Sequence, residues 1–297
     1  MIDPAPHLPF LAMALEEDLG GGDRTTRALV PETRRTTADL LGRADGVLCG
    51  LPFLEALVRI LDPDATVEAH LEDGARLADG VRVATVHGRA RAVLGSERTA
   101  LNVIRPRSGI ATLSARFVEA VRGLPVRILD TRKTTPGWRE LEKYAVRCGG
   151  AENHRLRLDD AAMIKENHLI AAFGRTGPAA VAEAVRRVRA SLPPAVPLCV
   201  EVEDHDELLA VVEERVDVVM LDGFDLAGLR RAVATVRALP ARRPLLEATG
   251  GITLETVRSV AETGVDRISV GALTHSAPAL DLSIRHRPGG TASPAAG

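Results

Sequence analysis

The sequence predicts an α/β protein with two parts, an α+β domain over residues 1–108 and a (β/α) barrel over residues 109–275. Up to residue 107, short apolar or alternating runs follow one another without α/β alternation, which is typical of an antiparallel sheet. From Ser108 onward, six short apolar runs alternate with helical stretches, which is typical of parallel βαβ units. This number of units favours a closed or nearly closed barrel over an open parallel sheet.

Local patterns predict the elements of the N-terminal domain. Residues 8–19 are amphipathic, and the apolar residues of 52–61 recur with helical spacing until Pro63 ends the run. Ser96 is a suitable N-cap for a helix that continues to Ile104, and Pro106 is expected to terminate this helix. Short apolar or alternating runs predict strands at 38–41, 47–49, 67–71 and 81–86.

The barrel elements follow from apolar runs for buried strands and from i, i+4, i+7 spacing for helices, as at Val181, Val185 and Val188. Strands are predicted at 126–129, 161–164, 198–202, 216–221, 244–246 and 267–270, and helices at 111–121, 139–147, 179–191, 207–214, 226–238 and 254–262. The tail at 288–297 is of low complexity and is predicted to be disordered.

Composition and missing motifs exclude several classes of function. The formal net charge of -2 and the aromatic content of 2% argue against nucleic-acid binding. No apolar run approaches the roughly 20 residues of a membrane span and no basic leader is present, so we expect no membrane partner and a cytoplasmic location. No GxGxxG or Walker-type segment follows a predicted strand. Cys49, Cys148 and Cys199 are widely spaced without a CxxC pair, so we expect reduced thiols and leave the role of Cys148 open.

Charged residues and glycines follow the predicted barrel strands at the points where these strands end. Cations come first, acids follow the next two strands, and glycine turns follow the last two. Because the carboxyl ends of barrel strands form the rim where such folds do their chemistry, we expect these residues to converge. They are Thr131, Arg132, Lys133, Lys165, Asn167, His168, Glu201, Glu203, Asp222, the segment 247–251 and the segment 271–275.

This order of residue types predicts two anionic reactants. Glycine turns that open a helix let backbone N–H groups approach a phosphate closely. Acids on adjacent strands, such as Glu201 and Asp222, suit Mg²⁺, which takes one or two carboxylates together with substrate phosphates. The arginines and lysines would then bind a second, acidic substrate.

Some charged residues also have simpler interpretations. Arg139, Lys143 and Arg147 recur at helical spacing and are predicted to form the solvated face of a helix. Glu203 is most simply a helix-start acid, and Asp222 alone is equally suited to cap the following turn. Arg98 and Arg105, taken singly, are predicted to lie on the surface, while the loop pair His154–Arg155 has no obvious core role.

The segments TRKTTPGWRELEKYAVRCGG, ENHR, MIKENH, VEVE, VVMLD, EATGG and ISVGALTHSA together resemble the quinolinate phosphoribosyltransferases. EEDLGGGDRTT, GVLCG, SERTALN and SGIAT extend the resemblance upstream, so that it runs in order from Ala14 to Ile284. The resemblance implies an N-terminal open-faced antiparallel sandwich, an incomplete (β/α) barrel and residues 276–287 packed back on the sandwich. It further implies a homodimer with shared active sites, in which the N-terminal domain of one subunit closes the barrel of its partner.

The same resemblance implies the reaction, the cofactor and the site residues. A phosphoribosyl group would pass from phosphoribosyl pyrophosphate (PRPP) to quinolinate with loss of CO₂, giving nicotinate mononucleotide and pyrophosphate for NAD biosynthesis. Mg²⁺ would be the cofactor, with Glu201 and Asp222 as its ligands. Quinolinate would contact Arg132, His154, Arg155 and Lys165, with Arg98 from the neighbouring chain; Lys133, Lys165, Glu201 and Asp222 would be catalytic; PRPP would further contact Thr131, Thr249, Gly250, Gly251, Val270, Gly271, Ala272 and His275.

The sequence departs from the family pattern at a few positions. Thr249 stands where serine is usual, Gly223 where asparagine is common, and Ala151 replaces the third glycine of a usual triple. Cys199 occupies the first of two common acidic positions, which leaves open whether Glu201 or Glu203 is the acidic ligand. None of these departures removes a group with a charged role.

Three alternatives remain at this point. A molybdenum-transport-associated paralogue would act on another acidic substrate, but the intact IKENH and NHR segments favour the quinolinate enzyme. A Schiff-base lyase using Lys165 or Lys133 would leave the surplus of arginines unexplained. A non-catalytic relative would be expected to lose the charged site residues, and all of them are present.

Overall fold

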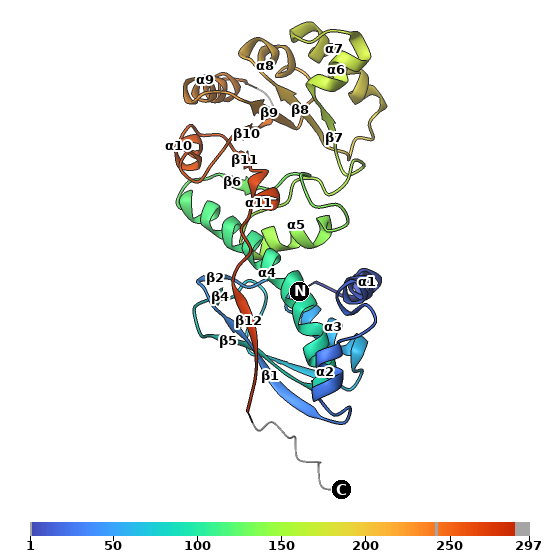
Figure 1. Cartoon of the computed structure of the whole chain (residues 1–297). Helices are drawn as coiled ribbons and strands as arrows, with labels where there is room; N and C mark the ends of the chain where they lie inside the picture. Colours follow the sequence, from blue (N-terminus) through green and yellow to red (C-terminus); the bar gives the residue numbers. More distant parts are fainter. Residues whose placement is uncertain (1, 241–242, 289–297) are drawn as a thin grey trace. The chain divides into compact units, whose positions relative to one another are not determined.

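The computed structural model describes residues 2–240 and 243–288, and within them the chain divides into two compact units (Figure 1). The N-terminal unit comprises the described residues of Met1–Leu113, Arg147–Gly150 and Ala277–Gly297. The barrel unit comprises those of Ser114–Val146 and Ala151–Ser276. The N-terminal unit therefore includes two segments from later in the sequence, and the first of them interrupts the barrel unit.

An antiparallel sheet forms the framework of the N-terminal unit. Its strand order is β12-β1-β5-β3, so the last strand of the chain pairs with the first, for example at Leu40 and Ile284. The strands are β1 (Arg35–Gly42), β3 (Thr66–Ala69), β5 (Arg82–Arg89) and β12 (Leu282–His286), and β2 (Gly46–Val47) pairs separately with β4 (Arg76–Leu77). This sheet and the parallel sheet described below confirm the predicted fold class.

The helices of the N-terminal unit follow from sequence patterns. α1 (Leu8–Leu19) and α3 (Pro52–Leu61) have the predicted bounds, and α3 buries Phe53, Leu54 and Leu57, which recur on one face. α2 (Arg24–Leu29) was not predicted; the Asp23 side chain caps it by accepting a hydrogen bond from the N–H of Thr26. The short 3₁₀ helix η1 (Ala5–His7) precedes α1.

One predicted helix boundary is wrong. α4 runs without interruption over Ala90–Ala120 and contains Pro106, where the sequence predicted a helix from Ser96 to Ile104 and a second one from 111. Ser96 is not a cap: it is buried in the helix, and its hydroxyl donates to the carbonyl of Ala92 at 2.9 Å. Proline removes one N–H from a helix, but Ile104 and Ser108 beside it are fully buried, and this packing outweighs the local preference.

The barrel unit is built on six parallel strands in the order β6-β11-β10-β9-β8-β7. Among the described residues, β7 pairs only with β8, and the free side of β6 forms only an isolated bridge from Leu129 to Glu152. The barrel is therefore incomplete. Its strands are β6 (Arg127–Leu129), β7 (Ala162–Ile164), β8 (Leu198–Val202), β9 (Val218–Asp222), β10 (Leu245–Thr249) and β11 (Arg267–Ser269).

Helices alternate with these strands as predicted, although several are shorter. They are α5 (Arg139–Cys148), α6 (Glu166–Phe173), α7 (Pro178–Ser191), α8 (His205–Val211), α9 (Leu226–Arg237), α10 (Val257–Ala261) and α11 (Ala272–His275). The helices α6 and α11, which are short and begin directly at strand ends, were not predicted from the sequence. The predicted disordered tail lies outside the described residues except for Pro288. In the part of the chain that the structure describes, none of the helices has the length and apolarity that a bilayer crossing requires.

Candidate active site

Polar side chains gather at the carboxyl ends of the barrel strands, as the sequence predicted. The register of the parallel sheet sets Asp222, the last residue of β9, beside Thr249, the last residue of β10. We call these strand-end residues the rim. Lys133 is exposed and the other members are partly exposed, in contrast to the apolar strand residues that precede them. The members of the rim are Thr131, Lys133, Lys165, Glu201, Asp222 and Thr249.

The glycine turn after β10 lies against the end of β9. Gly250 has φ +92°, and a Cβ atom at this position would stand 2.7 Å from an Asp222 carboxylate oxygen, so both the conformation and the space require glycine. Gly251, with φ +61°, continues the turn with open space beside it. The N–H of Gly223 donates to the carbonyl of Thr249 at 3.2 Å. The turn at Gly250–Gly251 therefore lies next to the Asp222 carboxylate. Such a pair suits a phosphate ligand with a bound metal ion, because the turn can receive the phosphate and the carboxylate can receive the ion.

A second glycine turn, after β11, lies against the loop that follows β6. The hydroxyl of Thr274 in α11 donates to the carbonyl of Lys133 at 2.7 Å. A Cβ atom on Gly271 would lie 3.2 Å from the Lys133 side chain and 3.1 Å from His275 Nε2. The N–H of Lys133 in turn donates to the Thr131 hydroxyl at 3.1 Å. These contacts bring together residues that the sequence assigned to the same substrate from opposite ends of the barrel domain.

Lys165 and Glu201 meet at the ends of β7 and β8, where the Lys165 ammonium donates to a Glu201 carboxylate oxygen. The backbone of Lys165 also begins α6, and its N–H donates to His168 Nδ1 at 3.0 Å. His168, which the sequence placed at the rim, therefore caps a helix. The side-chain nitrogen of Lys165 is thus engaged by Glu201, whereas Schiff-base chemistry needs this nitrogen as a free nucleophile.

Glu201 and Glu203, the two candidates for the acidic ligand after β8, differ in their surroundings. Glu201 points from β8 to Lys165 with its side chain 14% exposed, whereas Glu203 is exposed beyond the strand end, where its N–H donates to Glu207 at 3.0 Å. Desolvation raises the pKa of Glu203, and the charges of Glu166, Glu207, Asp222 and Glu201 add to that rise. The acids at this end of β8 and β9 thus share a negative potential that a bound cation would relieve.

A second set of polar side chains is buried, apart from the half-buried Asn153, and we call it the buried layer: Asp130, Lys143, Asn153, His154 and Glu247. Lys143 donates to Asp130 at 2.6 Å and to the carbonyl of His154 at 2.9 Å. Asp130 also accepts from the Asn153 amide at 2.6 Å and from the N–H of His154 at 2.8 Å. This one carboxylate therefore holds the segment that carries His154 and Arg155.

The predicted solvated face of α5 is wrong at Lys143, whose side chain is only 2% exposed and whose partner Asp130 is fully buried. Burial raises the pKa of the Asp130 carboxyl and lowers that of the Lys143 ammonium, and the attraction between the two opposes both shifts. Arg139 on the same helix is also half-buried, donating to the Thr134 hydroxyl and to the carbonyl of Leu156. The helical spacing was correct, but it could not show that a buried acid follows β6.

The geometry of His154 fixes its tautomer. The N–H of Arg155 donates to His154 Nδ1 at 2.8 Å, so in the neutral ring the proton is on Nε2. Nε2 faces Glu247 Oε1 at 3.4 Å, with side chains 8% and 0% exposed. This approach does not meet the geometry of a hydrogen bond, and both Glu247 oxygens lack a hydrogen-bond partner. The sequence placed Glu247 in the segment 247–251 that follows a predicted strand, whereas in the structure it lies inside β10 and is fully buried, which the local pattern could not show.

Two arginines converge near this histidine. Arg155 donates to the carbonyl of Ala161 at 2.7 Å, and burial lowers the pKa of its guanidinium, with the nearby charge of Arg132 adding to the shift. Arg132 Nε is likewise buried without a hydrogen-bond partner. Two like charges held close together in a partly buried site favour an anionic ligand.

The remaining predicted site residues are placed as follows. Val270 is buried, and its N–H donates to the carbonyl of Leu129 at 2.9 Å, while Ala272 opens α11 and His275 is exposed at its end. Arg98 is exposed on α4, in the N-terminal unit. Within the described residues, the one group of three potential metal ligands is Cys49, Asp73 and Cys148, outside the barrel unit. Glu201 and Asp222 offer two carboxylates, the number that Mg²⁺ commonly takes from protein.

Comparison with known proteins gives the same family over both units. Residues 23–108 match the family described as quinolinate phosphoribosyl transferase, N-terminal domain, and residues 110–285 match its C-terminal domain. The chain is 43% identical over 277 residues to nicotinate-nucleotide pyrophosphorylase [carboxylating] of Mycobacterium leprae, covering 91% of this chain and 94% of the relative. The chain is also 40% identical over 280 residues to the probable nicotinate-nucleotide pyrophosphorylase [carboxylating] of Synechocystis, which covers 93% of this chain and 91% of the relative. The solved structure of the nicotinate-nucleotide pyrophosphorylase from Francisella tularensis superposes with a TM-score of 0.87 at 35% identity, covering 97% and 98%.

Proposed function

Because the chain belongs to the quinolinate phosphoribosyltransferase family, we propose that the rim and buried layer of its barrel form the active site of that enzyme. The protein transfers a phosphoribosyl group from PRPP to quinolinate with decarboxylation, giving nicotinate mononucleotide, pyrophosphate and CO₂. Two observations support the assignment of the site: the closeness of Arg132 and Arg155, and the acids that share a negative potential at the ends of β8 and β9. Both occur in a chain that matches the family over residues 23–108 and 110–285.

Quinolinate is a dianion, and the proposed carboxylate site is the cluster of Arg132, His154 and Arg155 with Lys165 at its edge. The closeness of Arg132 and Arg155 supports this placement, since their mutual repulsion is relieved when carboxylates bind between them. The buried layer holds His154 and Arg155 through Asp130, so the carboxylates would be received by a fixed set of donors. This orientation would direct the ring nitrogen toward C1 of the ribose.

PRPP would lie along the rest of the rim. The glycine turns at Gly250–Gly251 and at Gly271 offer backbone N–H groups to its phosphates, with Thr131, Thr249, Val270, Ala272 and His275 beside them. Glu201 and Asp222 would bind Mg²⁺, and the shared negative potential of the acids around Glu203 supports a cation at this place. When bound, Mg²⁺ supplies charge stabilisation for the departing pyrophosphate.

In the proposed reaction, the quinolinate nitrogen forms a bond to C1 of the ribose while the bond from C1 to pyrophosphate oxygen breaks. Lys133 and Lys165 would stabilise the negative charge on the leaving group, and Glu201 and Asp222 would face the positive ribosyl centre. The carboxyl group next to the nitrogen then leaves as CO₂, and the electron pair left on carbon is stabilised by the cationic nitrogen until it takes a proton. No general base is needed for this step.

The test mixes the purified protein with quinolinate, PRPP and Mg²⁺ and follows nicotinate mononucleotide by mass, with nicotinate replacing quinolinate in a parallel reaction. We expect product from quinolinate only, and none after chelation of the metal. Arg132→Ala should lower kcat/KM for quinolinate by about 100-fold, whereas Arg230→Ala, an exposed arginine on α9, should leave it unchanged. Equal loss in both variants would contradict the carboxylate site.

The homodimer with shared sites and the cytoplasmic location belong to the same proposal. Arg98 is exposed in the N-terminal unit, which supports the proposal that it contacts a substrate bound to a neighbouring chain. Co-expression of Arg98→Ala and Arg132→Ala chains tests this directly. If the two residues act in one site from different subunits, mixed dimers contain one intact site and regain part of the activity that each variant lacks alone. Absence of any recovery in isolated mixed dimers would place Arg98 outside the site.

A further inference from the structure

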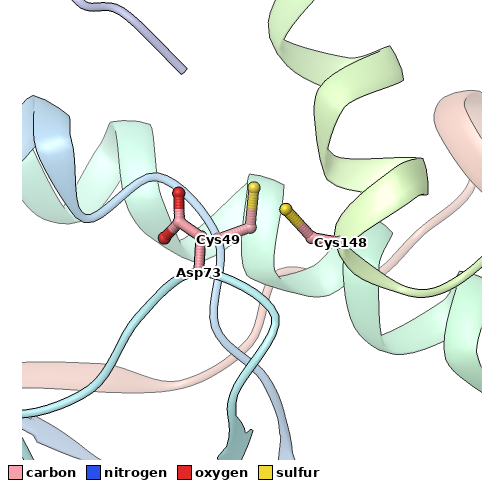
Figure 2. Close-up of side chains that lie close together, drawn as sticks. All are labelled: Cys49, Asp73 and Cys148. Carbon is pink, nitrogen blue, oxygen red and sulfur yellow. The ribbon is translucent and has the colours of Figure 1, made fainter. Parts of the chain in front are cut away.

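Three side chains from distant parts of the sequence lie together in the N-terminal unit: Cys49, Asp73 and Cys148 (Figure 2). The two thiol sulfurs and one carboxylate oxygen of Asp73 all lie within 4.8 Å of one another. Figure 2 shows the sulfurs of Cys49 and Cys148 pointing toward one another. Two cysteines that looked unrelated in the sequence therefore form a pair.

Cys49 is held in place from both sides. Its N–H donates to the Ser108 hydroxyl at 3.0 Å, and the same hydroxyl donates to the carbonyl of Cys49 at 3.3 Å. The next two N–H groups, of Gly50 and Leu51, donate to Asp73 Oδ1 at 2.9 and 3.0 Å. The position of the Cys49 sulfur is therefore set by four hydrogen bonds of its own segment, and the pair does not depend on a flexible loop.

The two cysteines differ in access. Cys49 is fully buried, whereas Cys148, the last residue of α5, is partly exposed. Burial raises the pKa of the Cys49 thiol, and the neighbouring Cys148 thiol and the Asp73 carboxylate add to the rise, while the Arg107 charge opposes it. Burial thus disfavours a thiolate at Cys49, and a product in which this sulfur carries no charge suits the site better.

The same three side chains could in principle hold a thiophilic metal ion, but the donor set argues against it. Structural zinc sites use four protein ligands, and this group supplies three. Asp73 Oδ1 is already engaged by two backbone N–H groups. The sulfurs, by contrast, need no further group in order to bond to each other.

We propose that Cys49 and Cys148 are a redox modification site that closes to an intramolecular disulfide when the protein meets a small-molecule disulfide such as oxidised glutathione. The partly exposed Cys148, as thiolate, attacks one sulfur of the oxidant and releases one molecule of thiol, giving a mixed disulfide on Cys148. Cys49 then attacks the Cys148 sulfur and releases the second thiol. The two electrons pass to the oxidant, and the two thiol protons end on the released thiols.

The position of the pair gives the modification a reason to matter. Cys148 ends the helix that carries Lys143, and only four residues separate it from Asn153. The intervening backbone is hydrogen-bonded, with the N–H of Ala151 on the carbonyl of Val146 at 3.2 Å and the N–H of Glu152 on that of Ile128 at 2.8 Å. A covalent bond at Cys148 therefore restrains the segment that leads into the buried layer.

Cys199 provides the internal contrast. It lies in the barrel core against Val218, Met220 and Met163 and is 4% exposed. Burial raises the pKa of this thiol to about 11, with the Glu247 carboxylate adding to the rise. Cys199 has neither a sulfur partner nor access in the described residues, so it should stay reduced under conditions that oxidise the pair.

The test incubates the full-length protein with oxidised glutathione, quenches it with iodoacetamide, and maps thiols and cross-linked peptides by mass spectrometry. We expect a Cys49–Cys148 cross-linked peptide, loss of alkylation at both positions, unchanged alkylation of denatured Cys199, and full reversal by dithiothreitol. The cross-link closes a loop of about 100 residues, so the thermal unfolding midpoint should rise by about 10 °C on oxidation.

Single variants separate the steps. Cys49→Ser should stop at a stable glutathione adduct on Cys148, and Cys148→Ser should remain unmodified, because the buried thiol lacks access. Asp73→Asn and Cys199→Ser should still form the cross-link. These readouts use mass and thiol count, so they stand whether or not the assignment of the active site is correct.

Two outcomes would overturn the proposal. One is a fully reduced, alkylatable pair after prolonged oxidation of the folded wild-type protein. The other is stoichiometric Zn²⁺ binding that protects both thiols, is lost in Asp73→Asn and is reversed by a chelator, without any cross-link in the metal-free protein.

Discussion

The rim and the buried layer of the barrel use the same kinds of residue for opposite purposes. Lys133 on the rim is exposed and contacts neighbours mainly through its backbone, whereas Lys143 in the buried layer is 2% exposed and bound to a fully buried carboxylate. Lys133 is therefore left available to a ligand, whereas Lys143 is neutralised by a buried carboxylate of the protein itself. The comparison of these two lysines shows what separates their roles. An exposed lysine can bind a ligand, whereas a buried lysine that is paired with a carboxylate stabilises the fold.

The comparison predicts the largest effect for the buried lysine. Lys143→Met removes the partner of Asp130, and loss of one member of a buried ion pair typically costs about 3–5 kcal/mol. We expect the free energy of unfolding of the barrel unit, measured by hydrogen exchange in β6 and α5, to fall by about that amount. A change below about 1 kcal/mol would mean that Asn153 and the N–H of His154 satisfy Asp130 alone.

The matched change on the rim should separate activity from stability. Lys133→Met is expected to lower kcat by about 100-fold or more, because the proposed stabilisation of the departing pyrophosphate is lost. Its unfolding midpoint should remain within the range of a neutral surface substitution. Steady-state kinetics with PRPP and a thermal melt on the same sample check both expectations. A destabilised Lys133→Met protein would show that the contacts of this loop with α11 depend on the side chain.

The two regions also differ in how far the sequence could predict them. The rim was predictable because parallel strands are apolar runs, and whatever follows such a run lies at the same barrel end. The buried layer was not, because the spacing of Arg139, Lys143 and Arg147 is the same for a solvated helix face and for one that meets a buried acid. Asp130 decides between these two interpretations of the helix. It pairs with Lys143, which is 13 residues further along the chain, and only the fold brings the two together.

Other errors have the same origin in tertiary packing. Pro106 is a sound local signal for a helix end, yet the buried residues on either side carry α4 through it. Cys49 and Cys148 show no pattern in the sequence, and only the fold brings their sulfurs together. Local patterns therefore predicted element types and strand ends, whereas partners between distant segments required the structure.

Glu247 tests whether the buried layer positions groups for the reaction as well as stabilising the fold. Its carboxylate is fully buried without a hydrogen-bond partner, 3.4 Å from His154 Nε2, and such a group is costly to the folded state. Glu247→Gln should therefore leave the unfolding midpoint unchanged or raised. Since the amide no longer attracts the Nε2 proton, we expect the KM for quinolinate to rise about tenfold with kcat nearly unchanged. A parallel fall in stability and activity would instead indicate a purely structural role.

The smallest effect is expected for a buried carboxylate that serves the fold alone, Asp39 in the N-terminal unit. Arg287 after β12 donates to both oxygens of Asp39, at 2.9 and 2.7 Å, and the Thr85 hydroxyl donates at 2.8 Å. The hydrogen bond from Arg287 is the largest cause that lowers the pKa of Asp39 below its ordinary value of 3.8. A lowered folded-state pKa means that the stabilisation is present above the ordinary value and is lost as the pH falls through the folded value.

Arg287→Gln should cost about 1 kcal/mol near neutral pH, because the arginine is partly solvated. The difference from wild type should vanish in acid, when Asp39 is protonated in both proteins. Hydrogen exchange of the β1 amides that pair with β12, followed from pH 7 downward, measures this, and a difference that persists in acid would mean that Arg287 acts through packing and not through its charge.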